Sequence, residues 1–241
     1  MNLAVIPARG GSKRIPRKNI KKFCGKPIIA WSIEAALASK CFDRVIVSTD
    51  DEEIAVVARE WGAEVPFMRP EELADDYVTT AAVVRHTIEW LADEGVSFEH
   101  VCCIYATAPF VTAEDIRRGL NLLIKNDTDY VFPITRFSSP IQRALKITES
   151  GRLEMFQPEH FYTRSQDLEE AYHDAGQFYW GLSEAWKEEK ILYSRRTVPI
   201  ILPRCLVQDI DTPEDWKYAE LMFHLLSARS FWNKSKILRR P

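Results

Sequence analysis

The sequence has no apolar run that approaches the roughly 18 residues of a transmembrane helix. Its first residues, MNLAVIPARGG, hold only a short apolar run with no basic region before it, so we expect no signal peptide. The formal net charge is −3, which argues against a general nucleic-acid or membrane binder. These absences predict a cytoplasmic protein whose basic residues matter only where they cluster.

Metal and dinucleotide motifs are also missing. The five cysteines form no CxxC pair, and the adjacent Cys102 and Cys103 lie within an apolar run, so reduced thiols are expected in place of zinc or disulfides. Neither GxGxxG nor GxxxxGK[ST] occurs, which disfavours a Rossmann dinucleotide loop and a Walker A loop.

Apolar strands and amphipathic helices alternate over about the first 135 residues. Strands are expected at 2–8, 44–50, 63–69, 100–109 and 129–137, helices at 26–39, 50–62, 79–95 and 112–126, and then strands at 176–182 and 198–211 and a last helix at 212–226. This alternation is typical of an α/β fold, a mainly parallel sheet with helices on both faces, in which ligands bind at the carboxyl ends of the strands.

Capping residues predict several helix ends. Asp50, with Glu53 three residues later, is expected to cap the second helix, and Gly62 to end it. Thr112 is expected to cap the fourth helix and Thr212 the last one.

The alternation stops between Ser138 and about Tyr172. This segment has short alternating pieces, a turn at 150–151 and many apolar residues with little helix to bury them. Exposed apolar groups of this kind normally mark an interface, so we expect a β-rich arm that joins two copies into a homodimer. The alternative is an arm that folds back onto its own sheet. The basic tail at 227–241 is poorly patterned and typical of disorder.

The basic residues gather directly after the first strand, in VIPARGGSKRIPRKNI. This loop holds two glycines and a serine together with five cations: Gly10, Gly11, Ser12, Arg9, Lys13, Arg14, Arg17 and Lys18. Glycines let backbone N–H groups turn toward one point, which makes a nest for phosphate oxygens, and cations neutralise their charge. The alternative is a solvated basic turn.

PARGGSKRIPRKN resembles the signature loop of the cytidylyltransferases that activate nine-carbon 2-keto acid sugars, the family of the CMP-sialic acid synthetases. The resemblance extends to about Leu226 and includes RPEELADD, YATAP, RSQDLEEAY and QDIDTPEDW. ATAPF, IQRALKI and AYHDAGQFYWG look most like the pseudaminic acid branch. The resemblance implies a Rossmann-like nucleotidyltransferase fold, a single domain over 1–241 with a dimerisation arm at about 138–172.

The resemblance also implies that the loop wraps the nucleotide triphosphate. It places on the nucleotide Ala8, Arg9, Gly10, Gly11, Ser12, Lys13, Lys18 and Asn19, with Arg69, Thr79 and Thr80 around the cytosine and ribose. Lys13 and Arg9 are expected to act catalytically, by holding the charge that develops on pyrophosphate.

Asp209 and Asp211 in QDIDTPED stand two positions apart in a segment expected to be extended, so both carboxylates face the same side. Nearby carboxylates repel each other unless a cation lies between them, and hard oxygens facing a triphosphate suit Mg²⁺. We therefore expect this pair to bind a catalytic magnesium ion, as the matching pair of the family does. The alternative, a helix N-terminus rich in acidic residues, explains Asp211 in part but not Asp209.

The sugar side departs from the sialic acid enzymes. A glutamine that resembles a sugar contact is replaced here by Tyr105, whose ring offers an apolar face and one hydroxyl. That exchange disfavours N-acetylneuraminate and suits the methyl groups of pseudaminate; the alternative is a core tyrosine. The resemblance implies further sugar contacts from Thr107, Arg143, Arg164, His173, Asp174, Gln177 and Phe178. A structural histidine and a salt bridge at Arg164 are the competing interpretations.

These features predict an enzyme that joins CTP and pseudaminate into CMP-pseudaminate and pyrophosphate, for bacterial surface glycans or flagellin. Legionaminate, N-acetylneuraminate and an octulosonate stay open as the sugar, and no side chain stands out as a general base. A non-catalytic nucleotide-sugar-binding protein is the alternative from another class. The presence of both the basic loop and the paired aspartates disfavours it.

Overall fold

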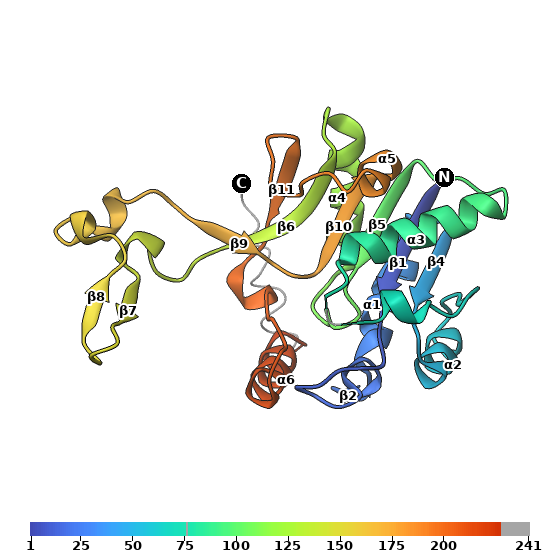
Figure 1. The fold of residues 1–241 in the computed structure, drawn as a ribbon, viewed down its shortest axis with the longest axis horizontal. Helices are drawn as coiled ribbons and strands as arrows, with labels where there is room; N and C mark the ends of the chain where they lie inside the picture. Colours follow the sequence, from blue (N-terminus) through green and yellow to red (C-terminus); the bar gives the residue numbers. More distant parts are fainter. Residues whose placement is uncertain (76, 228–241) are drawn as a thin grey trace.

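A mixed seven-stranded sheet forms the centre of the molecule (Figure 1). The computed structural model describes residues 1–75 and 77–227, so the tail predicted at 227–241 lies outside the described residues from position 228 onward. The strand order is β11-β6-β10-β5-β1-β4, and β9 pairs with β6. The strands are β1 (Asn2–Pro7), β4 (Arg44–Ser48), β5 (His100–Ile104), β6 (Tyr130–Arg136), β9 (Tyr172–Asp174), β10 (Phe178–Leu182) and β11 (Thr197–Ile201).

Most of the sheet is parallel, as the alternation predicts. β1 runs parallel to β4 and β5, and β6 runs parallel to β11. The exceptions are β10, which lies antiparallel between β5 and β6, and β9, which is antiparallel to β6. The carboxyl ends of β1 and β5 therefore lie at one edge of the sheet, where a ligand is expected.

Helices cover both faces of the sheet. They are α1 (Ile28–Ser39), α2 (Glu52–Glu60), α3 (Thr80–Asp93), α4 (Ala113–Lys125), α5 (Ser183–Lys187) and α6 (Pro213–Ser227). Strand alternation divides the core: Ala4 and Ile6 of β1 pack with α1 and α4, whereas Leu3 and Val5 pack with α3 and α5. Shorter elements are β2 (Lys22–Phe23), β3 (Lys26–Pro27), η1 (Lys18–Ile20), η2 (Glu71–Leu73) and η6 (Arg204–Leu206).

Three local predictions are wrong, those of one helix cap and two strands. The N-cap of α2 is Asp51, whose carboxylate accepts the N–H of Ile54 at 3.0 Å, because the carboxylate of Asp50 is held by the N–H of Gly10. The strand expected at 63–69 is reduced to one bridge between Ile46 and Glu64. The proline at position 66 removes an N–H that a continuing ladder would need. The strand expected at 198–211 ends at Ile201, because the chain turns into η6 after Pro203.

The other capping predictions are confirmed. The hydroxyl of Thr112 accepts the N–H of Asp115 at 3.1 Å, and that of Thr212 accepts the N–H of Asp215 at 3.2 Å. Gly62 follows α2 with a positive φ of 93°, the left-handed conformation that ends a helix.

The chain between β6 and β9 projects away from the sheet as an arm, at the left of Figure 1. Its strands are a hairpin of β7 (Leu145–Ile147) and β8 (Leu153–Met155), and single turns occur at η3 (Ile141–Arg143), η4 (Pro158–His160) and η5 (Ser165–Asp167). The alternative in which this segment folds back onto its own sheet is therefore wrong.

All five cysteines are free thiols, as their spacing predicts. Within residues 1–75 and 77–227, no helix combines the length and apolar character needed to cross a membrane.

Candidate active site

A cleft opens at the carboxyl end of β1, between the loop that follows this strand and the start of α3. Its lining residues are Pro7, Arg9, Ser12, Lys13, Arg14, Ile15, Lys18, Asn19, Arg69, Leu73, Asp75, Val78, Thr80, Val83 and Asp211. Cations from the first loop thus share one cavity with a carboxylate more than 190 positions away. The cleft joins most of the residues predicted to hold the nucleotide.

The loop keeps its shape through contacts with the start of α2. The N–H of Gly10 donates to Oδ1 of Asp50 at 2.9 Å, and a Cβ added at Gly10 would lie 2.7 Å from Oδ2 of Asp51. Gly10 is therefore required by a close approach, whereas a Cβ at Gly11 would meet open space. Ala8, the first residue of the loop, is buried, and its N–H donates to the carbonyl of Ser48 at 2.9 Å.

Arg17 forms the other anchor of the loop. It adopts a left-handed backbone with φ 55° and binds both Asp51 and Glu53 through its guanidinium. The hydrogen bond from Arg17 lowers the pKa of Asp51 below its usual value. One cation of the basic run is thus structural, while Arg9, Lys13, Arg14 and Lys18 line the cleft, which is not the arrangement of a merely solvated turn.

Asn19 and Arg9 couple the two ends of the loop. The buried side-chain amide of Asn19 donates to the carbonyl of Arg9 at 2.9 Å, and Arg9 donates from Nη1 to the carbonyl of Asp75 at 2.8 Å. Asp75 also lines the cleft, so this contact joins the loop to the segment before α3.

The two predicted metal ligands lie in the segment between η6 and α6, which forms no strand. Asp211 faces the cleft, and its Oδ1 lies 2.9 Å from Nη2 of Arg14 and 3.4 Å from Nζ of Lys18. Partial desolvation and the neighbouring Asp211 carboxylate raise the pKa of Asp209. Asp209 itself is exposed and does not line the cleft, so its role as a metal ligand stays a prediction.

The capping role that the helix-terminus alternative gives to Asp211 belongs to another residue. Oδ2 of Asp215 accepts the N–H groups of Asp211 and Thr212 at 3.1 and 2.7 Å, so Asp215 caps α6 together with Thr212. The Asp211 carboxylate is left to the cations of the first loop. Across the two described stretches, no group of three or more His, Cys, Asp or Glu is arranged to hold a metal. Asp209 and Asp211 would therefore supply only part of a coordination shell.

The predicted base-side residues lie on the opposite wall. Arg69 is buried at the end of β4, where Nε lies 3.1 Å from Oγ of Ser48 and the guanidinium also donates to the Ser48 carbonyl. Burial lowers the pKa of Arg69 to about 10, which leaves it charged at neutral pH. Thr80 lines the cleft, but Thr79 caps α3, with its hydroxyl 3.1 Å from the N–H of Ala82.

Beyond Thr80, three tyrosines and one aspartate form a cluster at the ends of β5, β9 and β10. The rings of Tyr105 and Tyr179 have centroids 5.2 Å apart, and burial raises the pKa of both hydroxyls. The Tyr179 hydroxyl lies 2.9 Å from each carboxylate oxygen of Asp174, and the Tyr193 hydroxyl donates to its Oδ2 at 3.0 Å. Tyr105 lies beside Thr80 of the cleft wall, whereas none of the four cluster residues lines the cleft itself.

Four predicted sugar contacts lie around this cluster or behind it. Thr107 is half-buried in the turn after β5. Gln177 is buried and donates to the carbonyl of Leu206 at 2.6 Å, while its Oε1 has no hydrogen-bond partner among the described residues. Phe178 requires a correction: it points to the opposite face of β10 from Tyr179 and is fully buried against α4, so it cannot touch a ligand. His173 makes an edge contact with the ring of Phe137, with centroids 4.8 Å apart, in a separate hollow at the root of the arm.

The two predicted arginines of the sugar site lie on the projecting arm. Arg164 forms a two-point ion pair with Asp167, at 2.7 and 3.3 Å, and Arg143 donates to Ser165 at 3.3 Å. Within one chain the structure does not bring them to the tyrosine cluster.

Several residues of the cleft and of the tyrosine cluster had no predicted role. Tyr179 could have been found from strand alternation, since it follows Phe178 on the other face of β10. Arg14 belonged to the predicted loop without an assigned contact. Asp75 and Tyr193 come from irregular segments, where no periodicity points to a side-chain direction.

Comparison with known proteins places the chain. The family model described as cytidylyltransferase matches residues 3–216. The chain is 47% identical over 230 residues to a pseudaminic acid cytidylyltransferase from Campylobacter jejuni, covering 95% of this chain and 99% of the relative. It is 36% identical over 230 residues to a CMP-N,N'-diacetyllegionaminic acid synthase from Legionella pneumophila, covering 92% and 96%.

A solved structure of CMP:2-keto-3-deoxy-manno-octonic acid synthetase complexed with CTP has the same fold. The TM-score is 0.67 at 17% sequence identity, covering 93% of this chain and 98% of that one. The family match covers most of the chain, and the two relatives match over more than nine tenths of it. The chain belongs to the cytidylyltransferase family.

Proposed function

We propose that this protein transfers the cytidylyl group of CTP to pseudaminate, releasing pyrophosphate. The observation that carries the proposal is the meeting of the first-loop cations with Asp211 in one cleft at the carboxyl end of β1. A triphosphate needs both features: cations for the leaving group and carboxylates for the metal that accompanies it.

The chemistry exchanges one phosphorus–oxygen bond for another. The anomeric hydroxyl oxygen of the sugar bonds to the α-phosphorus of CTP, the bond from this phosphorus to the oxygen bridging the β-phosphate breaks, and pyrophosphate leaves. The hydroxyl proton passes to solvent, because no side chain of the cleft stands out as its acceptor. Catalysis then rests on positioning and charge stabilisation.

The first loop supplies the positive charge. Lys13 and Arg9 line the cleft and would hold the charge that develops on the leaving pyrophosphate. Backbone N–H groups of the loop would add hydrogen bonds to phosphate oxygens. Arg69 and Thr80, on the opposite wall, would hold the cytidine end of the nucleotide.

The donor set fits Mg²⁺. Two carboxylates within electrostatic reach of each other are hard oxygen ligands, and phosphate oxygens and water would complete the coordination. When bound at Asp209 and Asp211, Mg²⁺ would screen the phosphate charge and acidify the attacking hydroxyl. Arg14 and Lys18 neutralise Asp211 in the structure described here and would turn to phosphate oxygens when the nucleotide binds.

The tyrosine cluster favours pseudaminate as the sugar. The half-buried Tyr105 and the exposed Tyr193 offer aromatic surface near the cleft, suited to methyl-bearing acetamido groups, while Tyr179 is buried between them and the core. Both oxygens of Asp174 accept hydrogen bonds from tyrosine hydroxyls, and Oδ1 also accepts the N–H of Gly176, so Asp174 orients the tyrosine rings. Relatives named for pseudaminate and for diacetyllegionaminate both lie close in sequence, so legionaminate is the nearest competing substrate.

We also propose that the enzyme works as a homodimer in the cytoplasm. The large apolar side chains exposed on the arm are Ile141, Leu145, Ile147, Leu153, Phe156, Phe161 and Tyr162. Exposed groups on this scale need a partner surface. A two-fold exchange of arms would cover these side chains. It would also carry Arg143 and Arg164 to the sugar site of the partner subunit, whereas within one chain these arginines lie away from the tyrosine cluster.

The test is a substrate panel. The purified protein is incubated with CTP, Mg²⁺ and, in turn, pseudaminate, N,N'-diacetyllegionaminate, N-acetylneuraminate or 2-keto-3-deoxy-octonate. Pyrophosphate release and the mass of the CMP-sugar are measured. Product with pseudaminate supports the proposal, and the absence of pyrophosphate release with every sugar overturns it.

A further inference from the structure

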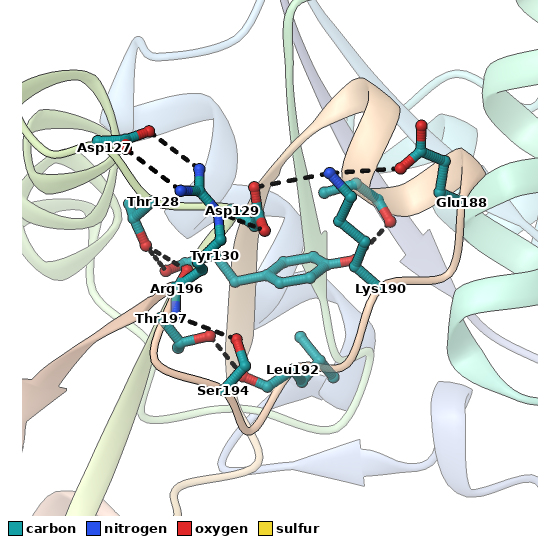
Figure 2. A network of polar contacts seen from close by, with 11 residues as sticks. Asp127, Thr128, Asp129, Tyr130, Glu188, Lys190, Leu192, Ser194, Arg196 and Thr197 are labelled. Atoms are coloured by element: carbon teal, nitrogen blue, oxygen red, sulfur yellow. Dashed lines mark hydrogen bonds and ion pairs between the residues drawn. The ribbon is translucent and has the colours of Figure 1, made fainter.

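A buried carboxylate away from the cleft holds two cations of one loop. Asp129, in the turn between α4 and β6, has a side chain only 8% exposed. Nε of Arg196 lies 2.9 Å from its Oδ2, and Nζ of Lys190 lies 3.8 Å from its Oδ1 (Figure 2). Buried charges are costly unless paired, so this pairing holds Arg196 closely. Lys190 adds a longer contact to Asp129 and also pairs with Glu188 at 3.3 Å.

The two cations are the ends of one connection. Lys190 and Arg196 enclose the loop that joins α5 to β11. At its start, Glu189 takes a left-handed conformation with φ 49°, the N–H of Lys190 bonds the carbonyl of Ala185, and Arg85 of α3 pairs with Glu189. At its end, the carbonyl of Arg196 accepts the N–H of Asp129 at 2.8 Å.

Further hydrogen bonds brace the loop between these ends. The Thr197 hydroxyl donates to the carbonyl of Leu192 at 2.5 Å, and the Thr128 hydroxyl donates to the carbonyl of Arg196 at 2.5 Å. Figure 2 shows these contacts running from the Asp127–Asp129 turn to both ends of the loop. The loop is therefore clamped to the end of β6 opposite the arm.

This loop carries Tyr193, which lies between Lys190 and Arg196. Its hydroxyl donates to Asp174 at 3.0 Å, and its ring contacts Phe132 with centroids 5.8 Å apart. Asp174 also holds the Tyr179 hydroxyl, which places Tyr193 in the wall proposed to face the sugar. Tyr193 is 71% exposed, so few packing contacts fix its ring. Its position therefore depends on the contacts that hold the two ends of the loop.

We propose that Asp129 is a positioning residue for the sugar site, which acts through Lys190 and Arg196 on the placement of Tyr193. This inference rests on the proposed function, because it assumes that the tyrosine cluster meets the sugar. Asp129 touches no substrate. Its loss should therefore weaken sugar recognition while leaving the CTP cleft, built from other elements, intact.

The experiment compares Asp129→Asn and Arg196→Gln with the wild type and with Asp127→Asn. The control removes the 92%-exposed partner of the same arginine, whose ion pair is screened by solvent. We expect both test variants to raise KM for pseudaminate about tenfold, with KM for CTP unchanged. In a Tyr193→Phe background, Asp129→Asn should add little further. Amide hydrogen exchange should accelerate in residues 188–197 and stay constant in β1 and β5.

The outcomes separate the two claims. A wild type inactive on every nonulosonate overturns the proposed function, while the exchange rates alone still judge the clamp. An active wild type with unchanged sugar KM in both variants overturns the positioning role. A lower melting temperature together with an equal rise of KM for pseudaminate and for CTP also overturns it, since that result describes a merely structural residue.

Discussion

Lys18 and Asp211, 193 positions apart in the chain, meet in the cleft with Nζ 3.4 Å from Oδ1. The same ammonium group donates to the carbonyl of Ile210 at 2.7 Å, which ties the first loop to the segment before α6. The cations that would bind the triphosphate and the carboxylates that would bind its metal are thus prearranged side by side.

Replacing Lys13 with alanine should lower kcat about 10²–10³-fold, because it removes a charge-assisted contact proposed for the leaving pyrophosphate. Pyrophosphate release under saturating CTP measures the effect. Lys22→Ala, which removes an exposed lysine outside the cleft, is the matched control and should turn over like the wild type. A Lys13→Ala enzyme with unchanged kcat would contradict the assignment.

Asp209→Asn and Asp211→Asn should each abolish most activity while the melting temperature stays near that of the wild type, since neither side chain belongs to the core. EDTA should have the same effect on the wild type, reversed by added Mg²⁺. Thr212→Ala tests the helix-terminus alternative: it should cost about 1 kcal/mol of stability through the lost cap and spare the turnover. Full activity in EDTA would rule out the metal role.

Sequence patterns were reliable where one face of an element must be buried. Most of the strands, the helices and the caps at Thr112 and Thr212 follow from apolar periodicity and local hydrogen bonding. The cap of α2 was misplaced by one residue because a long-range contact, the Gly10 N–H on Asp50, decided it. The order β5-β10-β6 could not be read from periodicity, which carries no information on neighbours.

The same distinction holds for the site. The basic loop and the aspartate pair were predicted because their chemistry is concentrated in two short stretches. Tyr179, Tyr193 and Asp75 were missed because their roles depend on where the folded chain points their polar groups. Phe178 was assigned to the sugar by its neighbourhood in sequence, although strand alternation turns it into the core.

The protein should elute with twice the 27.8 kDa mass of one chain in size exclusion coupled to light scattering. Ile147→Asp and Leu153→Asp, at positions paired across the β7–β8 hairpin, should together shift the mass to that of one chain. Sugar turnover should fall as well, since the arm arginines of the partner subunit would be lost. Ile124→Asp, at an exposed position of α4, is the control and should stay dimeric. A wild type with the mass of one chain at micromolar concentration would refute the dimer and any shared site.

Stability should fall on mild acidification. Burial lowers the pKa of His86 and His100 below the usual 6.5. The unfolded chain therefore binds more protons than the folded one as pH drops through 6.5 toward the folded pKa values, and the free energy of unfolding decreases. We expect the melting temperature to drop by about 2–4 °C between about pH 7.5 and about pH 5.5. His100→Gln should reduce this drop, whereas His160→Gln on the arm should not; an unchanged pH profile in His100→Gln would contradict the account.

The most direct test of the account is the ratio of kcat/KM for pseudaminate to that for N-acetylneuraminate, with CTP and Mg²⁺ saturating. The tyrosine cluster predicts a ratio of about ten or more in favour of pseudaminate. A ratio below one would contradict pseudaminate as the sugar and leave the cytidylyltransferase chemistry standing, and no pyrophosphate from either sugar would contradict both.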